Sequence, residues 1–274
     1  MNQIDIAASI VLYNNDRKML KAAIDSFLAV QLKIRLYLID NSPTDVLKDL
    51  IVDERVVYKH NPSNPGFGAG HNIAIKDIGA GTAYFLVLNP DIYFEKGVVE
   101  NILSYMYQNQ DVGVVMPKIL YPDGEIQYVA KLLPTISNFL IRRFIPIKAL
   151  TQKKNEEFEL KKSNYDTIIE APFLSGCFMI FRQDVLLKID GFDENIFMYT
   201  EDIDICRRVI RFGLKCIFYP VVSVFHDHEK KSFLKYKTLK VYLRSAIYYF
   251  NKYGWFFDRE RESINRKTLK QFVK

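Results

Sequence analysis

The sequence predicts an α/β fold in which helices cover both faces of a mainly parallel sheet. Nearly continuous apolar runs occupy 6–13, 34–39 and 83–88, as expected of strands that are buried on both faces. Between these runs, apolar residues recur at helical spacing, and polar turn clusters follow two of the runs. Such alternation of strands and helices is typical of a parallel sheet flanked by helices.

The first half is expected to form five strands and two helices. The strands are 6–13, 34–39, 55–58, 83–88 and 112–116, and the helices are 20–28, capped by Asp16, and 98–106. A loop rich in glycine, asparagine and proline is expected over 61–70. The turn clusters after two of the strands are Asp40-Asn41-Ser42-Pro43 and Asn89-Pro90-Asp91.

The second half is less regular. Residues 137–150 are apolar and basic, and the charged segment 151–164 is expected to be a loop. Further strands are expected over 173–181 and 215–219, and helices over 201–211 and 234–253. The helix 201–211 begins with acidic residues and ends with arginines, which suits the helix dipole.

Composition narrows the class of protein. Of the 274 residues, 49% are hydrophobic and 26% are charged, which excludes a disordered, collagen-like or low-complexity chain. The three scattered cysteines argue against a disulfide framework or a zinc site and indicate a reducing compartment. We recognise neither a signal peptide nor an apolar run of about 20 residues, so we expect a cytoplasmic protein, soluble or peripheral to a membrane.

Polar residues at the carboxyl ends of the strands are the first candidates for a ligand site. Asp40, the segment 64–72 and Asp91 each follow an expected strand, and ligands of open α/β sheets bind at that edge. An acidic residue there can equally cap a helix. The segment 64–72 lacks the G-x-G-x-x-G pattern and the P-loop lysine, which argues against a dinucleotide site. Its glycines serve either a turn or close approach of the backbone to a ligand.

Carboxylates and histidines of the second half are further candidates. Glu201, Asp202 and Asp204 begin a helix, where they either compensate its dipole or provide a general base with an orienting neighbour. His226 and His228 follow the last strand, in a chain with only four histidines. A histidine and the acid of the Asn-Pro-Asp turn could together hold a divalent cation.

The order and spacing of several short motifs resemble those of one enzyme family. The motifs are Ser9–Asn14 (SIVLYN), Ile39–Ser42 (IDNS), Asn64–Asn72 (NPGFGAGHN), Leu88–Asp91 (LNPD), Phe173–Cys177 (FLSGC), Gly191–Glu194 (GFDE), Thr200–Asp204 (TEDID), and His226 with Ser232. From Ile6 to Asp258 the chain resembles inverting family 2 glycosyltransferases of the GT-A fold, in the bacterial rhamnosyltransferase-like subgroup. The resemblance implies a nucleotide-sugar-binding half over 1–116, an acceptor-binding half over 117–228, and a C-terminal helical extension over 229–274.

The resemblance also implies roles for individual residues. It places Tyr13 and Asn14 near the base of the donor, Asp40 on its pyrimidine, and Asn64, Gly66, Asn72 and Asn89 along the nucleotide–sugar pocket. Asp202 corresponds to the catalytic base, Glu201 and Asp204 to residues that orient or hold the acceptor, and Asp91 and His226 to ligands of Mg²⁺ or Mn²⁺.

Two positions depart from the family pattern. Asn89 stands where the strict acidic motif has a carboxylate, which leaves one anionic metal ligand in the motif. Binding of the metal then depends more on His226, with His228 as the alternative histidine ligand. His71 stands where a small or amide residue is expected. It either touches the diphosphate or the donor sugar, or it is inert.

The implied reaction moves a sugar, with L-rhamnose favoured, from a dTDP- or UDP-sugar to a lipid-linked oligosaccharide on the inner leaflet, in O-antigen or capsule biosynthesis. One alternative is a degenerate protein of the same fold that acts as a binding or assembly subunit. A weaker one is a sugar-nucleotide pyrophosphorylase, whose basic glycine-rich loop after the first strand is missing here. No helix-turn-helix, RNA-binding or zinc-finger signature supports nucleic acid as a partner.

Charge is distributed unevenly along the chain. The net charge is +6, but residues 229–274 carry 13 Lys/Arg and 4 Asp/Glu, whereas residues 1–228 are slightly acidic. This basic tail also holds Tyr248, Tyr249, Phe250, Tyr253, Trp255, Phe256 and Phe257, and Lys237, Lys240 and Arg244 form a stripe on its expected helix. The tail is either a solvated face beside a core helix or a contact with anionic lipid headgroups, with the aromatic rings at the interface.

Overall fold

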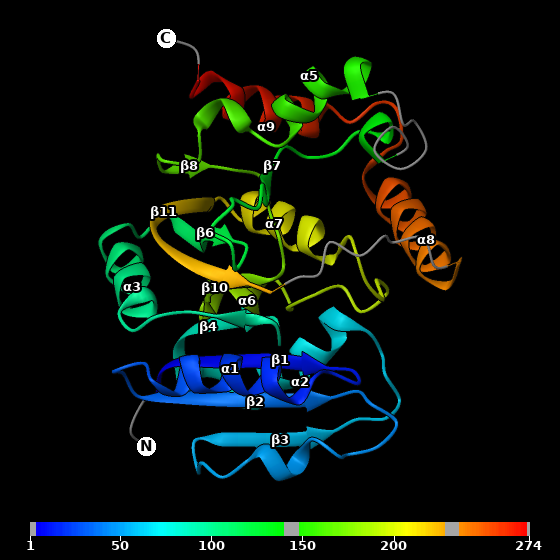
Figure 1. Ribbon diagram of the computed structural model, residues 1–274. Coiled ribbons are helices and arrows are strands. Elements are labelled where there is room, and N and C mark those ends of the chain that lie inside the picture. The colour runs from blue at the N-terminus through cyan, green and yellow to red at the C-terminus, as the bar shows by residue number, and fades with distance from the viewer. Residues whose placement is uncertain (1–3, 140–147, 228–235, 273–274) are drawn as a thin grey trace.

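A mixed sheet in the order β3-β2-β1-β4-β10-β6-β11-β5 runs through the molecule, and β8 also pairs with β11 (Figure 1). The structure, a computed structural model, describes residues 4–139, 148–227 and 236–272. The strands are β1 Ile4–Leu12, β2 Ile34–Asp40, β3 Val56–His60, β4 Thr82–Leu88, β5 Ile92–Tyr93, β6 Val112–Leu120, β8 Ile169–Glu170, β10 Phe178–Arg182 and β11 Lys215–His226. A separate small sheet pairs β7, Ala130–Lys131, with β9, Phe173–Leu174.

Most strands of the large sheet run in one direction. β1 pairs in parallel with β2 and β4, β2 pairs in parallel with β3, and β11 pairs in parallel with β6. β10 lies antiparallel between β4 and β6, so β4 and β6 share a direction. The arrowheads of β1, β2 and β11 therefore point to the same side (Figure 1). The predicted α/β fold is confirmed, and its carboxyl edge is continuous across both halves.

Helices cover both faces of this sheet. They are α1 Arg17–Leu28, α2 Phe67–Ile78, α3 Val98–Gln108, α5 Lys148–Phe158, α6 Gln183–Lys188, α7 Glu201–Arg211, α8 Tyr236–Tyr253 and α9 Arg259–Lys270, with short 3-10 turns η1 Lys48–Leu50, η2 Gly79–Gly81 and η3 Lys161–Ser163. α1 follows its sequence pattern, because the side chain of Asp16 accepts from two N–H groups of the first turn and the apolar stripe is buried.

The segment 61–70, expected as a loop, contains the start of α2. Gly66 caps this helix with φ 111°, and the first turn runs through the glycine-rich residues that follow. Small residues stand there because the helix lies against β1. A Cβ on Gly70 would lie 2.7 Å from Val11 Cγ2. The glycines thus allow close packing of a helix, which a helix propensity alone does not predict.

Two further expectations are corrected. The charged segment 151–164 is not a loop, because α5 and η3 occupy much of it. Its polar residues show weak helical periodicity, so the pattern did not reveal the helix. The last strand is also longer than 215–219. β11 continues to His226 after a register shift between Tyr219 and Ser223.

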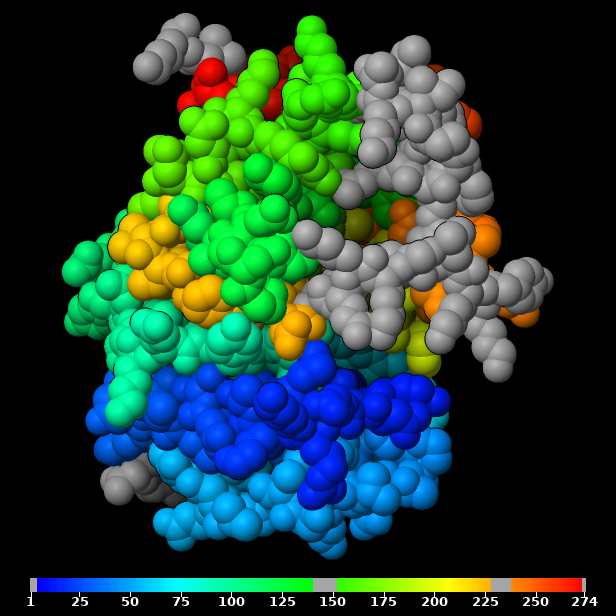
Figure 2. Space-filling model, in the orientation of Figure 1, coloured from blue at the N-terminus to red at the C-terminus, as the bar shows by residue number. Residues whose placement is uncertain are grey.

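The described part of the C-terminal extension packs into the same body. Tyr249, Phe250 and Tyr253 of α8 are buried in the core, and Asn265 of α9 bonds the backbone of Leu133. The space-filling view shows the N-terminal segments below and the green and red segments above as one continuous body (Figure 2). None of the described helices is both long and apolar enough to cross a membrane.

Candidate active site

Strand register gathers polar residues at the carboxyl edge of the sheet. Leu12 at the end of β1 pairs with Asp40, and Ile10 pairs with Leu88, the last residue of β4. The residues after β1, β2 and β4 are therefore neighbours, and the N–H of Asn14 donates to Ser42 Oγ at 2.8 Å. Tyr13, beyond β1, is exposed. This edge is where the sequence predicts the ligand site.

Asp91 and His226 come together across β5 and β11. His226, the last residue of β11, pairs with Ile92, which brings its Nε2 to 3.2 Å from Asp91 Oδ1. Among the described residues, no three His, Cys, Asp or Glu side chains gather to hold a metal ion. A carboxylate oxygen and an imidazole nitrogen still suit a divalent cation that takes its other ligands from a diphosphate and water. The pair predicted from sequence therefore fits such a cation.

Asp202 lies in the first turn of α7, beside the turn between β9 and β10. Its carboxylate accepts from the N–H of Gly176 at 3.2 Å and from that of Ile203 at 2.9 Å. Burial nevertheless raises the pKa of Asp202 to about 6. Burial, together with the charge of Asp202, raises the pKa of the neighbouring Glu201 to about 8. A half-buried carboxylate with a raised pKa has the properties of a general base.

Contacts and charges around Cys177 relate the Asp91–His226 pair to Asp202. Its carbonyl accepts from the N–H of Asn89, the first residue of the Asn-Pro-Asp turn that contains Asp91. Burial raises the pKa of the Cys177 thiol to about 12, and the charges of Asp91 and Asp202 add to that increase. The acid of the Asp91–His226 pair and the carboxylate of Asp202 therefore both lie near the 175–177 turn.

Asp40 does not face an open site. It is fully buried, its Oδ2 accepts from Tyr58 Oη at 2.6 Å, and its Oδ1 accepts from the N–H of Ser42 at 2.9 Å. The structure thus gives Asp40 a positioning role, in which it joins β2 to β3 and closes the turn that bonds Asn14. Direct recognition of a pyrimidine by Asp40 is not supported by this arrangement.

Residues of the 64–72 motif mainly hold two chain segments together. Asn72 donates to Phe192 O and to Glu194, and its amide oxygen accepts from the N–H of Phe192. Gly66 packs so closely that a Cβ would lie 2.4 Å from Phe197 O. Asn64 is partly exposed and has φ 45°. Contact of Asn72 and Gly66 with the donor is therefore not supported, because both secure the 192–197 segment.

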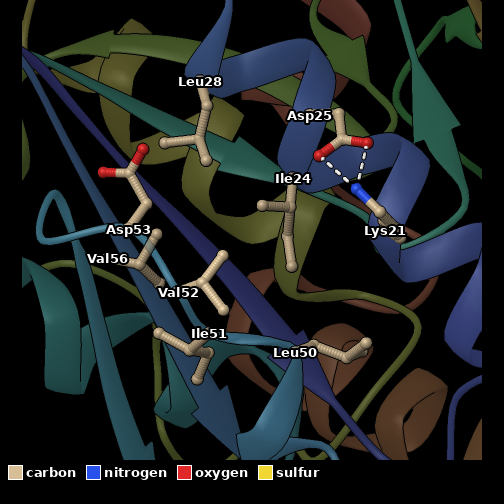
Figure 3. A pocket seen from close by; sticks show the side chains of 9 residues that line it. All are labelled: Lys21, Ile24, Asp25, Leu28, Leu50, Ile51, Val52, Asp53 and Val56. Atoms are coloured by element: carbon tan, nitrogen blue, oxygen red, sulfur yellow. Dashed lines mark hydrogen bonds and ion pairs between the residues drawn. The ribbon is translucent and has the colours of Figure 1, made fainter.

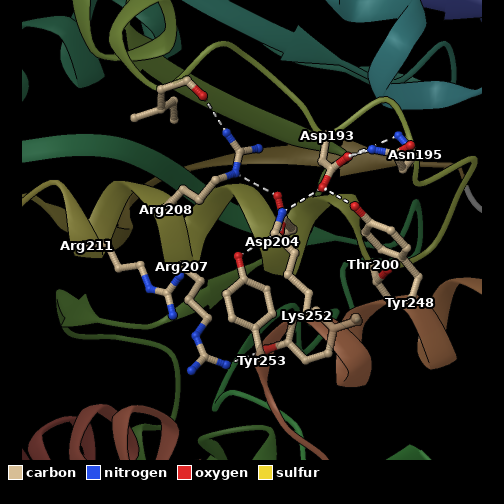
Figure 4. A network of polar contacts seen from close by, with 12 residues as sticks. Asp193, Asn195, Thr200, Asp204, Arg207, Arg208, Arg211, Tyr248, Lys252 and Tyr253 are labelled. Atoms are coloured by element: carbon tan, nitrogen blue, oxygen red, sulfur yellow. Dashed lines mark hydrogen bonds and ion pairs between the residues drawn. The ribbon is translucent and has the colours of Figure 1, made fainter.

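Asp204 belongs to a buried ion-pair network (Figure 4). Its Oδ2 accepts from Arg208 at 2.7 Å, and its Oδ1 accepts from Lys252 and Tyr253 of α8. Oδ1 therefore joins α7 to α8, while Oδ2 is held within α7. The acceptor-orienting role expected for Asp204 is not supported, since the residue is fully buried and both of its oxygens accept from protein side chains.

His71 packs in the interior. It is fully buried, its Nδ1 lies 2.6 Å from Ser9 Oγ, and its ring contacts those of Phe67 and Phe192. Burial lowers the pKa of His71 to about 3, so the imidazole is neutral at physiological pH. His71 was expected either to touch the diphosphate or the donor sugar or to be inert, and its burial fits the inert role. His228 and Ser232 lie outside the described residues.

Two residues near the site had no signal in the sequence. The charge of Lys131, in β7, counteracts the raised pKa of Asp202. Gln127 lies beside His226, with its Oε1 3.0 Å from Nδ1. Neither stands in a motif, and a hairpin that cannot be located from spacing brings Gln127 to His226.

A cavity of about 50 Å³ lies between α1 and the segment before β3 (Figure 3). Its lining includes Ile24, Leu28 and Val56, the first residue of β3. It therefore opens at the amino end of β3, across the sheet from the candidate site. Its size and position argue against a role in binding a nucleotide-sugar.

The fold is of the GT-A type. Two solved structures share the fold: GalNAc-T7 with UDP, GalNAc and Mn²⁺ (TM-score 0.64, 15% identity, 92% of this chain and 50% of that one), and the mannosyltransferase PcManGT of Pyrobaculum calidifontis with GDP-Man and Mn²⁺ (TM-score 0.57, 12% identity, 84% and 59%). At these identities the likeness concerns the fold alone.

The particular family follows from sequence. The profile of glycosyl transferase family 2 matches residues 8–190, so the chain belongs to this family. Rhamnosyltransferase WbbL of Escherichia coli K12 is 26% identical over 195 residues, which cover 67% of this chain and 69% of WbbL. The N-acetylglucosaminyl-diphospho-decaprenol L-rhamnosyltransferase of Mycobacterium tuberculosis is 27% identical over 216 residues, covering 73% and 68%. Asp202 and His226 lie beyond the profile match.

Proposed function

We propose that the protein is an inverting, cation-dependent glycosyltransferase that moves a sugar, with L-rhamnose favoured, from a dTDP- or UDP-sugar to a lipid-linked saccharide. The observation that carries this proposal is the position of Asp202 and the Asp91–His226 pair near one turn, at the carboxyl edge of the sheet. The names of the two rhamnosyltransferase relatives support the sugar, and the decaprenol-linked substrate named for one supports the class of acceptor.

The chain's own groups account for a single displacement. Asp202 accepts the proton of the acceptor hydroxyl, and its raised pKa makes it a stronger base that is still ionised at neutral pH. The hydroxyl oxygen then bonds the anomeric carbon as the bond from that carbon to the diphosphate breaks, which inverts the configuration. A divalent cation bound by Asp91 and His226 would supply Lewis-acid stabilisation of the departing diphosphate.

The direct test is turnover with a panel of nucleotide-sugars and a polyprenyl-diphosphate-linked saccharide. With Mg²⁺ or Mn²⁺, the purified protein is expected to release dTDP or UDP and to form a lipid-linked product of inverted anomeric configuration. Donor binding by folded protein without turnover across the panel would contradict the proposal and favour the degenerate binding subunit.

Asp91→Ala is expected to weaken Mn²⁺ binding and to lower kcat/KM by about 100-fold or more, because the diphosphate loses much of its Lewis-acid stabilisation. Titration of Mn²⁺ in the presence of dTDP or UDP measures the first effect, and initial rates measure the second. Asp123→Ala, in an exposed turn, is the matched control and should change neither. Equal Mn²⁺ affinity of the Asp91 variant and the wild type would contradict a cation site at Asp91.

We also propose that the C-terminal helices meet the surface of the membrane that carries the acceptor. The aromatic residues of the tail divide into two groups, and Tyr249, Phe250 and Tyr253 are buried in the core. Phe256 and Phe257, between α8 and α9, are 75% and 94% exposed, with the partly exposed Trp255 beside them. Lys240 and Arg244 on α8 are also exposed. Exposed aromatic rings and exposed cations on the same C-terminal extension suit an anionic lipid interface.

The double variant Phe256→Ser with Phe257→Ser is expected to lower binding to phosphatidylglycerol vesicles by about 10-fold or more, because two apolar rings leave the interface. Co-sedimentation with vesicles measures the effect. Tyr107→Ser is the matched control, since Tyr107 is likewise 75% exposed but belongs to α3, a helix that lies across the molecule from α8 (Figure 1). Unchanged binding of the double variant would refute contact through these rings.

A further inference from the structure

We propose that Gln127 is a positioning residue that fixes the tautomer of His226, so that the Nε2 lone pair is directed to the bound cation. Gln127 follows β6 after a tight turn, and its N–H donates to Ile119 O at 2.9 Å. Its side chain is buried, with 7% exposure for the residue, and both ends of its amide contact His226. This inference rests on the proposed function to the extent that Asp91 and His226 hold a cation.

Hydrogen-bond chemistry orients the amide of Gln127. Its Nε2 lies 3.0 Å from the carbonyl oxygen of His226 and 3.5 Å from that of Leu120. Carbonyl oxygens only accept, so this end of the amide must be the NH₂ group. The amide oxygen is then the atom 3.0 Å from His226 Nδ1. Because an amide oxygen also only accepts, Nδ1 must carry a hydrogen.

The assigned proton decides what Nε2 can do. In a neutral imidazole with a hydrogen on Nδ1, Nε2 has the lone pair and can bind a metal ion. That lone pair lies 3.2 Å from Asp91 Oδ1, so two electron-pair donors face each other, an arrangement that a cation between them stabilises.

The Asp91 carboxylate by itself would favour the other tautomer. It would accept a hydrogen bond from Nε2–H, and His226 would then have no lone pair for the cation. Gln127 opposes that outcome because only Nδ1–H satisfies its amide oxygen. It contacts neither cation nor substrate in this arrangement, which makes it a positioning residue of the kind that orients metal-bound histidines.

Nitrogen NMR tests the tautomer directly. The chain has four histidines, so ¹⁵N-histidine labelling gives few signals, and His226→Gln identifies those of His226. In the wild type at a pH where His226 is neutral, Nδ1 is expected to be protonated. Gln127→Met, similar in size but without the amide, should shift His226 toward the Nε2–H form and weaken Mn²⁺ binding about 10- to 100-fold. Gln127→Glu retains an acceptor for Nδ1–H and should preserve the tautomer, but its second oxygen faces the carbonyl oxygens of His226 and Leu120, so its melting temperature should fall.

Two controls separate positioning from packing. Gln110→Met, at an exposed position, should leave the tautomer and the Mn²⁺ affinity unchanged, and the signals of His71 should not move in any Gln127 variant. An Nε2–H tautomer in the wild type would overturn the inference, as would a Gln127→Met variant with unaltered tautomer and Mn²⁺ affinity. Failure of the wild type to bind Mn²⁺ would overturn the proposed cation site, and the spectra would still decide the tautomer.

Discussion

Asp202→Asn is expected to lower kcat by about 100- to 10,000-fold, the usual contribution of a general base, and to leave binding of dTDP or UDP unchanged. The amide keeps the shape of the carboxylate, and its single oxygen can still accept from the N–H of Ile203 or of Gly176, but it cannot take the proton of the acceptor hydroxyl. Steady-state rates and calorimetric titration with nucleotide measure the two quantities. A variant with the wild-type kcat would exclude Asp202 as the base.

Asp204→Asn provides the matched control from the same helix turn. Its carboxylate bonds Arg208, Lys252 and Tyr253, so its amide should lower the stability of the fold through lost ion pairs. The rate per folded molecule should fall much less than in the Asp202 variant. A loss of kcat as large as that of Asp202→Asn would return Asp204 to the reaction site.

The raised pKa of Asp202 gives the same variant a second measurable effect. Burial raises the pKa of this carboxyl to about 6, so the folded protein keeps a proton that the unfolded chain has released. Folding stability therefore falls as pH rises from about 4 to 6, by on the order of 2 kcal/mol. Asp202→Asn removes that loss. Its melting temperature should exceed that of the wild type above pH 6 and match it near pH 4, while wild-type activity should rise with pH through about 6.

Sequence patterns reveal the features of this fold that depend on local chemistry. The strands that end at Asp40 and Leu88 are mostly apolar because most of their residues are buried on both faces, and this is visible without a structure. α2 was missed because its small residues serve a contact with Val11 of β1, which is a tertiary requirement. α5 was missed because its residues have no strong apolar stripe.

The residues of the candidate site also differ in how well their motifs indicate what they do in the structure. Asp91, Asp202 and His226 stand at or just beyond the ends of elements, and the structure brings them near one turn. Asn72 and Asp204 stand in equally good motifs, but their polar atoms bond Phe192, 120 positions away, and α8. A motif does not distinguish an amide or carboxylate that meets a ligand from one that secures a distant segment.

Arg207→Leu is expected to destabilise the fold by about 3–5 kcal/mol, because it leaves a buried carboxylate without its partner. Arg207 of α7 is 1% exposed and bonds Asp258, ahead of α9, through Nη1 at 2.7 Å and Nη2 at 2.6 Å. It also bonds Glu260 and Tyr249, so it joins α7 to both C-terminal helices. Chemical denaturation measures the change in the free energy of unfolding.

A comparison of variants tests whether the Arg207 network fixes the C-terminal helices α8 and α9 to α7. Arg17→Leu removes an ion pair with Asp49 at an exposed position and should leave stability nearly unchanged. Asp258→Asn combined with Arg207→Leu removes both buried charges, so the double variant should be more stable than Arg207→Leu alone. Arg207→Leu and Arg17→Leu proteins of equal stability would contradict the network's role. If the expected order holds, α8 and α9, which flank Phe256 and Phe257, are fixed to α7, which carries Asp202, so the proposed contact of these rings with a membrane would hold the proposed base at a set position relative to that membrane.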